Sequence, residues 1–347
     1  MWIADKYIDY VREQTIENPG QSWGRMLLGF QANKLRTKLL PKKEISKGYQ
    51  KLEALMMSFV ADSLCRPDSY VWGNIFSPCE IMQCFGLNTL SIECLACYLS
   101  GYRLEDYFID YAQNTGIAPT LCSYHKTFVG AIDSGAVPAP WYAVTTSLSC
   151  DGNLNTFRYL EKKKGVPFTF LDVPYGDDDA SVEYLAGQLR DFAGELERRF
   201  GKTFDEEKLR ENIRIENETR KELMRFFQLQ SEYYYPGELI SHLYMMMGMH
   251  LLIGTQEFLD LVRFMIKEIQ TYPKFEGKKI LWVHLLPFYQ ESLQHYFNAN
   301  QKYQIIASDI ILDSVEEMDT ERPFHALARK IIHNAYNGSY SHRAELV

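Results

Sequence analysis

The stretch from Tyr70 to about Tyr175 constrains the fold most, because short apolar runs alternate there with helix starts. Three such runs are predicted to be strands: residues 88–93, 141–146 and 167–173. Helices are predicted between them: residues 123–134 and 151–164. Strands joined by helices at this spacing form a parallel sheet, so we predict an α/β protein.

The same pattern returns near the end of the sequence. Residues 179–277 are predicted to be nearly all helical, because apolar side chains recur there every three or four positions. Beyond Gly277, residues 279–285 and 303–307 are predicted strands. Two strands are few for an open sheet, so the second lobe is expected to be incomplete. We predict four parts: a helical N-terminal arm (1–65), a first lobe (66–178), a helical insertion (179–277) and a partial second lobe (278–347).

Charge and hydropathy exclude several classes of protein. Lys and Arg total 37 against 45 for Asp and Glu, and no long block of like charge occurs, which disfavours nucleic-acid and membrane-surface binding. No apolar stretch is long enough to span a bilayer, and the N-terminus lacks the pattern of a secretory signal. We therefore expect a cytoplasmic protein.

All seven cysteines lie between Cys65 and Cys150. In a reducing compartment such cysteines bind metal, take part in redox chemistry or pack in the core. Cys122 is predicted at a loop-to-helix junction. Cys150 is predicted between a strand and a helix, near the carboxyl end of a parallel strand, where α/β proteins bind ligands. A helix N-terminus favours the thiolate, which is the form that binds metal. The alternative is that both are buried structural thiols.

A zinc site built from the other cysteines is a competing hypothesis. Cys94 and Cys97 have the spacing of metal ligands, and Cys79 and Cys84 could complete a tetrahedral site. Cys79 and Cys84 are five residues apart on one predicted helix, however, and do not share a face. Buried core thiols are the preferred interpretation.

Several segments resemble, in order and spacing, the 2-hydroxyacyl-CoA dehydratase and benzoyl-CoA reductase family, in particular subunits like the D-component of 2-hydroxyglutaryl-CoA dehydratase. The resemblance covers most of the chain from about residue 50 onward. It is carried by residues 122–131 (CSYHKTFVGA), 145–153 (TTSLSCDGN), 165–167 (GVP) and 171–175 (LDVPY). Residues 77–86 (SPCEIMQCFG) resemble an early helix of that family, and residues 319–338 a late one.

The resemblance implies two Rossmann-like lobes and a [4Fe-4S] cluster held by three cysteines of one subunit. It also implies an acyl-CoA substrate, a paralogous second subunit or a homodimer, and an ATP-dependent iron-sulfur activator protein. The reaction it implies is radical: one electron enters the thioester carbonyl, and the resulting ketyl expels the hydroxyl group as water is eliminated. An iron with an open position can also act as a Lewis acid.

Cys122 and Cys150 match the first two cluster ligands of that family. The family's third cysteine belongs to the C-terminal lobe, and no cysteine follows Cys150. We expect either that the third cysteine lies beyond Val347 in a longer chain, or that at most two of these ligands are present. His284, at the end of a predicted strand, is a possible substitute, although an ordinary strand-end histidine is the preferred interpretation.

Three further residues are candidates for catalysis. Glu80 corresponds to a glutamate that the family carries near its active site, so it is a candidate proton carrier. Its alternative role is structural, as the capping-box partner of Ser77 at the start of a helix with Pro78 at the first position. Ser123 and Lys126 lie beside Cys122, where they could reach the cluster or an acyl-CoA, or serve as surface and capping residues.

The resulting hypothesis is an enzyme, a hydro-lyase subunit that converts a 2-hydroxyacyl-CoA to a 2-enoyl-CoA. The alternatives are a non-catalytic or electron-transferring partner subunit, and a reductase of an aromatic or unsaturated acyl-CoA. No glycine-rich dinucleotide motif or phosphate-binding P-loop occurs, so ATP chemistry is expected to belong to the activator.

Overall fold

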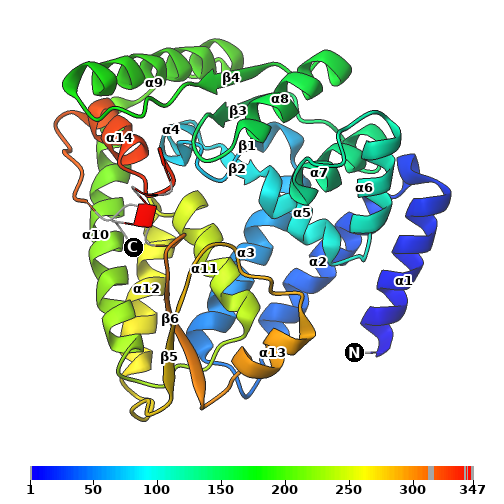
Figure 1. Cartoon of the computed structure of the whole chain (residues 1–347), viewed down its shortest axis with the longest axis vertical. Coiled ribbons are helices and arrows are strands. Elements are labelled where there is room, and N and C mark those ends of the chain that lie inside the picture. Colours follow the sequence, from blue (N-terminus) through cyan, green and yellow to red (C-terminus); the bar gives the residue numbers. More distant parts are fainter. Residues whose placement is uncertain (1, 312–315, 340, 342, 345–347) are drawn as a thin grey trace. The chain divides into compact units, whose positions relative to one another are not determined.

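The structure is a computed structural model that describes residues 2–311, 316–339, 341 and 343–344 (Figure 1). The helices are α1 (Trp2–Glu17), α2 (Trp23–Leu39), α3 (Lys47–Leu64), α4 (Cys79–Cys84), α5 (Ile92–Ser100), α6 (Glu105–Asn114), α7 (Ser123–Asp133), α8 (Asp151–Lys164), α9 (Asp179–Phe200), α10 (Glu206–Gln230), α11 (Leu239–Leu251), α12 (Gln256–Ile269), α13 (Glu291–Phe297) and α14 (Pro323–Ile332). The strands are β1 (Tyr70–Gly73), β2 (Asn88–Ser91), β3 (Ala143–Thr146), β4 (Phe168–Leu171), β5 (Lys278–Trp282) and β6 (Tyr303–Ser308).

The chain forms two compact units. The first consists of residues 1–34, 58–77 and 86–172, and the second of residues 35–57, 78–85 and 173–347. The predicted helical character of residues 1–65 and 179–277 is confirmed. The division into four parts stays a prediction.

The first unit contains a parallel four-stranded sheet in the order β2-β1-β3-β4. This confirms the predicted α/β class. β1 and β3 are buried along their whole length, as expected for inner strands with helices on both faces. β1 was not predicted as a strand. β2 ends at Ser91, earlier than predicted, because the Ser91 hydroxyl accepts a hydrogen bond from Cys94 N at 3.3 Å and so starts α5.

Helices α7 and α8 begin and end almost as predicted, and α8 runs over exactly the residues expected from the sequence. Gly165 ends α8 with φ +67°, a left-handed conformation that glycine adopts without steric cost. α7 contacts α5, α6 and α8. Its Phe128 ring packs edge-on against Trp72 of β1, with 4.7 Å between ring centroids. These contacts attach α7 to the sheet and to its neighbouring helices.

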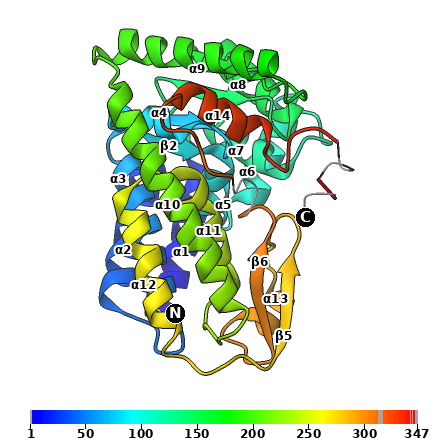
Figure 2. The same cartoon turned by 90° about the vertical axis from the view of Figure 1, so that its left-hand side faces the viewer.

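The second unit combines long helices with a parallel two-stranded sheet of β5 and β6. Figure 2 shows α10 and α12 side by side, and the two helices are in contact. The predicted strands near residues 279 and 303 are thus confirmed. A hydrophobic cluster of Leu239, Leu286 and Ile305 packs beside this sheet.

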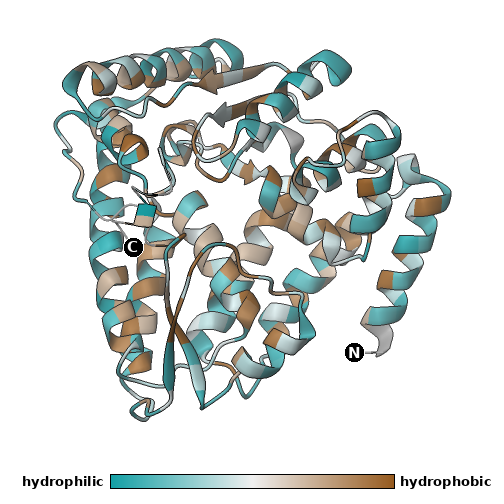
Figure 3. Ribbon diagram, viewed as in Figure 1, coloured by the Kyte–Doolittle hydropathy of each residue, from teal (hydrophilic) through white to brown (hydrophobic). Residues whose placement is uncertain are grey.

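α9 shows the predicted amphipathic pattern, with buried residues that include Val182, Leu185 and Leu189. Figure 3 shows this long helix at the top, with brown hydrophobic and teal hydrophilic positions around it. Such a pattern is typical of a helix that buries one stripe against its neighbours. Within the described residues, we find no helix both long and apolar enough to cross a bilayer.

Candidate functional site

Cys122 and Cys150 occupy equivalent positions in the first unit, because each is the residue that precedes a helix. Cys122 is exposed at the start of α7, and its carbonyl accepts a hydrogen bond from Lys126 N at 3.0 Å. Cys150 is half-buried at the start of α8, and its carbonyl accepts from Asn153 N at 3.1 Å. Both thiols are free. Two free thiols at the starts of packed helices can bind a metal centre as thiolates.

Gly152 marks the place where these two helix starts meet. A Cβ built on Gly152 would lie 3.1 Å from Cys150 Sγ, 3.4 Å from Leu121 Cδ1 and 3.5 Å from His125 Nε2. Residues from the loop before α7, from α7 itself and from the start of α8 therefore border one small space. Glycine leaves this space open next to the Cys150 thiol, and any larger residue would fill it.

The site lies where the direction of the first sheet's connections reverses. The chain runs from β1 outward to β2 and then returns to add β3 on the other side of β1. Ligands in open α/β sheets bind at the carboxyl ends of strands at such a switch point. Asn74, just after β1, ties the two strands together there, because its Nδ2 donates to Thr146 Oγ1 at 3.0 Å and its Oδ1 accepts from Thr146 N at 3.2 Å.

The loop from β3 to Cys150 has an unusual backbone. Ser149 has φ +73°, a left-handed conformation that is rare for a residue with a side chain. Such a conformation costs energy and is found mainly where the surrounding structure requires it, often at functional sites. Here it turns the chain directly before Cys150.

His125 is a site residue that the sequence interpretation did not select. It is 3% exposed, and its Nδ1 is 2.8 Å from the Thr156 hydroxyl of α8. Burial lowers the pKa of His125 to about 4, so the imidazole is uncharged at neutral pH. The structure places its Nε2 and Cys150 Sγ around the same space beside Gly152. The two residues lie on different helices, so only the packing of α7 on α8 reveals this.

Ser123 and Lys126 differ in where their side chains lie. Ser123 is exposed at the first position of α7. Lys126 is 8% exposed and donates from Nζ to the carbonyl of Pro119 at 2.7 Å, so its ammonium orders the loop that leads to Cys122. The catalytic roles suggested for both residues stay predictions.

Glu80 belongs to a buried cluster of charges in the second unit. Its carboxylate pairs with Lys330 of α14, and Lys330 Nζ is also 2.8 Å from Glu216 Oε1 of α10. Arg220 donates to the same Glu216 oxygen from Nη2 at 2.6 Å.

The capping-box interpretation of Ser77 and Glu80 was wrong. Ser77 Oγ donates to Asn74 at 2.8 Å, and the Glu80 carboxylate faces Lys330. The candidate role of Glu80 as a proton carrier stays a prediction.

The two glutamates of this cluster differ in their proton affinity. Burial raises the pKa of Glu80. Lys330 lowers this pKa and Glu216 raises it, and because the effect of burial is the largest, the pKa lies above its ordinary value. Burial also opposes the ionisation of Glu216, but Lys330 and Arg220 outweigh it and hold the pKa of Glu216 at about 2. Glu216 is therefore the permanent anion of the cluster, and Glu80 is the carboxyl that takes up a proton first.

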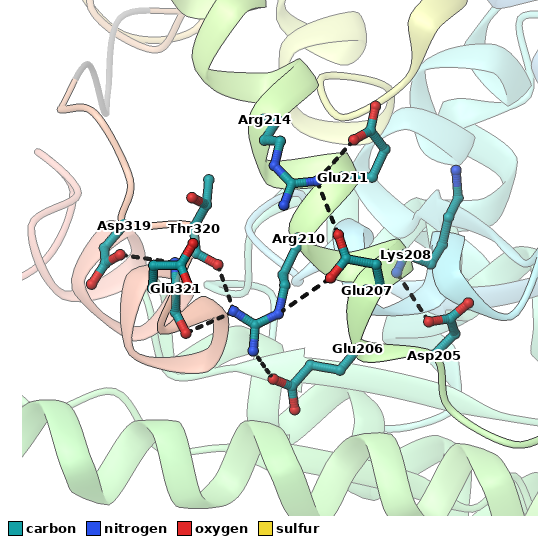
Figure 4. A network of polar contacts seen from close by, with 10 residues as sticks. All are labelled: Asp205, Glu206, Glu207, Lys208, Arg210, Glu211, Arg214, Asp319, Thr320 and Glu321. Carbon is teal, nitrogen blue, oxygen red and sulfur yellow. Dashed lines mark hydrogen bonds and ion pairs between the residues drawn. The ribbon is translucent and has the colours of Figure 1, made fainter.

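The segment before α14 is attached to α10 by side chains that bind its backbone (Figure 4). Arg210 donates to the carbonyl of Thr320 at 3.0 Å and to that of Glu321 at 2.7 Å. Further along α10, Asn217 donates to Met318 O at 2.8 Å and accepts from Met318 N at 2.9 Å. These contacts fix the start of α14 and, with it, the position of Lys330.

His284 lies in the second unit, just after β5, with φ +73°. Its backbone N donates to Asp309 Oδ1 at 2.8 Å, and its ring stacks on Tyr336 with 6.1 Å between centroids. Burial lowers the pKa of His284, and the nearby Arg343 lowers it further. These contacts give the residue a structural role in the turn, and its suggested role as a cluster ligand stays untested.

Four of the other cysteines, Cys79, Cys84, Cys94 and Cys97, behave as packing residues, whereas Cys65 is exposed. Burial raises the pKa of Cys84 and of Cys97 to about 12, and the pKa values of Cys79 and Cys94 lie well above their ordinary value for the same reason. Thiols held protonated in this way are poor metal ligands. Across the part of the chain that the structure describes, no three His, Cys, Asp or Glu side chains come together as a metal site.

Comparison with known proteins identifies the family. The sequence model for "2-hydroxyglutaryl-CoA dehydratase, D-component" matches residues 74–347, a range that contains Glu80, Cys122 and Cys150. The chain belongs to this family. The resemblance seen in the sequence is thereby confirmed, and the match begins at the residue that follows β1.

The chain is similar to proteins described as dehydratase alpha subunits. The (R)-phenyllactyl-CoA dehydratase alpha subunit of Clostridium sporogenes is 20% identical over 267 residues, which cover 70% of this chain and 65% of that protein. The (R)-2-hydroxyisocaproyl-CoA dehydratase alpha subunit of Clostridioides difficile is 23% identical over 156 residues, covering 42% of this chain and 38% of that protein. The chain thus spans less than two thirds of the length of these relatives.

Proposed function

We propose that this protein is a subunit of a 2-hydroxyacyl-CoA dehydratase and takes part in eliminating water from a 2-hydroxyacyl-CoA to give a 2-enoyl-CoA. Membership of the 2-hydroxyglutaryl-CoA dehydratase D-component family supports this, as do two relatives named as alpha subunits of such enzymes. The observation that carries the proposal is the pair of free cysteines, Cys122 and Cys150, at the N-termini of α7 and α8. They are placed where an α/β sheet binds its ligand.

The residues around these thiols are compatible with a bound iron-sulfur cluster. Cys122 is exposed and Cys150 half-buried, so both can reach a group that enters from solvent. Gly152 leaves open the space beside Cys150 Sγ that a side chain would otherwise fill. We propose that both cysteines hold a [4Fe-4S] cluster as thiolates. When bound, such a cluster supplies single-electron transfer and a Lewis-acidic iron.

The proposal includes partners. The relatives are named as alpha subunits, which implies a second subunit in their complexes. We extend this to the present chain and propose that it works with a paralogous subunit or a second copy of itself. An ATP-hydrolysing activator would supply the electrons, since this sequence contains no P-loop.

We expect the protein purified without oxygen to contain iron and acid-labile sulfide in equal amounts. Cys122→Ala and Cys150→Ala should each lose most of both, because each removes a thiolate ligand. Cys65→Ala is the matched control: Cys65 is also free and exposed, but lies outside the site, so iron content should not change. The measurement is iron and sulfide per chain, before and after reconstitution with ferrous iron and sulfide.

The same preparations discriminate between the proposed functions. Iron binding together with water elimination from a 2-hydroxyacyl-CoA, in the presence of the activator and a reductant, supports the dehydratase. Iron binding with reduction of an unsaturated or aromatic acyl-CoA instead supports the reductase. Absence of iron from the wild-type protein even after reconstitution would contradict the cluster and leave a non-catalytic partner subunit.

Gly152→Ala should lose iron without losing stability. The added methyl group would lie 3.1 Å from Cys150 Sγ and occupy the space beside it. Alanine is the better helix former, so the free energy of unfolding should stay within about 1 kcal/mol of wild type. Gly187→Ala is the control, because nothing lies within 4 Å of a Cβ at that position in α9. Iron retained by Gly152→Ala at the wild-type level would show that the bound group does not use this space.

A further inference from the structure

One oxygen in the buried charge cluster of the second unit lacks a partner. Glu216 is fully buried, and the cation contacts described for it all end on Oε1: Lys330 Nζ at 2.8 Å, Arg220 Nε at 3.0 Å and Arg220 Nη2 at 2.6 Å. Its Oε2 is buried and receives no hydrogen bond from a described residue. An unpaired oxygen of a buried carboxylate costs stability, so a donor is expected at this position.

The side chain of Glu80 is placed to supply this donor. Glu80 is buried and contacts the same Lys330 ammonium as Glu216 does. The carboxyl groups of Glu80 and Glu216 lie within hydrogen-bonding reach of each other. Two ionised carboxylates are both acceptors, so a hydrogen bond between them requires a proton on one of the two. A protonated Glu80 donates to the Glu216 oxygen that the cations leave without a partner.

The neighbouring cations decide which of the two carboxyl groups carries the proton. Glu216 is bound by Lys330 and Arg220, whereas Glu80 contacts the single cation Lys330 among the described residues. Burial opposes the ionisation of both carboxyl groups and raises the pKa of Glu80, but in Glu216 the two cations outweigh burial and hold the pKa at about 2. The proton therefore resides on Glu80, because like charges that share one buried site are not both ionised.

The other groups around Glu80 add no charge to this pair. Cys79 and Cys84 lie with Glu80 on α4, and burial raises the pKa of both thiols, so both are uncharged at neutral pH. From α10, Asn212 donates through Nδ2 to the backbone carbonyl of Glu80 at 3.3 Å and not to its carboxyl group. The charges that face Glu80 are thus those of Lys330 on α14 and of Glu216 and Arg220 on α10.

We propose that Glu80 and Glu216 form a carboxylic acid–carboxylate pair, in which Glu80 carries a proton at neutral pH and donates a hydrogen bond to Glu216 Oε2. The pair is a buried proton-binding site that joins α4 to α10 beneath the Lys330 ammonium of α14. Every residue in it belongs to the second unit, so the inference is independent of the cysteine site and of the proposed function.

Infrared spectroscopy tests the proton directly. At pH 7 the wild-type protein should show the carbonyl band of a protonated carboxyl group, which shifts in D₂O and is absent from Glu80→Gln. Glu232→Gln is the control and should keep the band, because Glu232 is exposed and its hydrogen bond and ion pair with Lys274 lower its pKa. A wild-type spectrum without this band at pH 7 would mean that both carboxyl groups are ionised, and would overturn the inference.

Variants of Glu216 test whether the two residues act as a pair. In Glu216→Gln, Glu80 is the carboxyl group left to balance Lys330, so it should ionise and the band should disappear although Glu80 is present. In Glu216→Asp the shorter side chain withdraws the acceptor, so the hydrogen bond weakens and the band should move to higher wavenumber. A band unchanged in both variants would show that burial alone keeps Glu80 neutral, and would overturn the pair. If Glu80→Gln or Glu216→Gln does not fold, the shift in Glu216→Asp decides the question.

Discussion

Replacing Lys330 with Met should lower the free energy of unfolding by about 3–5 kcal/mol at pH 8, the range found when one partner of a buried ion pair is removed. Lys330 contacts both Glu80, which is 1% exposed, and Glu216, which is fully buried. Without the ammonium, Arg220 is the cation that remains with these two carboxylates in the described cluster. Urea denaturation of wild type and variant measures the difference.

Two further variants test the cause of this loss. Lys274→Met removes an exposed ion pair with Glu232, whose atoms are 2.8 Å apart, and should cost less than about 1 kcal/mol. The double variant Lys330→Met with Glu80→Gln should recover part of the stability, because Gln carries no charge to leave unpaired. A loss for Lys330→Met no larger than for Lys274→Met would contradict a buried charge cluster.

The effect of Lys330→Met should also depend on pH. Because burial raises the pKa of Glu80, the folded protein binds this proton more tightly than the unfolded chain does. The stability from Glu80 is therefore present below the ordinary carboxyl pKa and is lost as pH rises through the raised value. Removing Lys330 raises that value further, so the variant should lose more stability than wild type between pH 5 and pH 8. A difference that is constant over this range would show that Glu80 does not take up the proton.

The sequence predicted those parts of the fold that local chemistry determines. α8 matched its predicted bounds because a strand end and Cys150 precede it and Gly165 adopts the left-handed conformation that ends it. β1 was missed because it is only four residues long and fully buried, so it shows no alternation of polar and apolar residues. The sequence also placed Cys122 and Cys150 directly before predicted helices, and the structure confirms both positions.

Contacts between distant residues explain what the sequence could not predict. Glu80 fits the local pattern of a capping box, yet its carboxylate pairs with Lys330, 250 positions further along the chain. A strong tertiary charge partner overrides a weak local preference. His125 could not be linked to Cys150 from the sequence, because the two residues belong to different helices and only the packing of α7 on α8 brings both to the space beside Gly152.

Gly130→Ala should destabilise the first unit by about 3 kcal/mol or more, at the upper end of the cost of overpacking. Gly130 lies where α7 crosses α6, and a Cβ there would overlap the carbonyl oxygen of Phe108 and lie 2.6 Å from its carbonyl carbon. These are backbone atoms of a helix, which cannot move aside as a flexible side chain can. α6 and α7 would have to separate, and urea denaturation should report the loss.

The same substitution connects packing to the proposed site. α7 carries Cys122 at its start and His125 in its first turn, so a displacement of α7 moves both relative to Cys150 on α8. Gly130→Ala should therefore lose iron as well as stability, whereas Gly152→Ala should lose iron alone. Gly194→Ala in α9 is the control, because the nearest atom to a Cβ there, Arg198 Nη1, is at an ordinary 3.6 Å. A Gly130→Ala protein as stable as this control would contradict the close approach of α6 and α7. Loss of stability with full iron content would instead show that the cysteines keep their positions when the two helices separate.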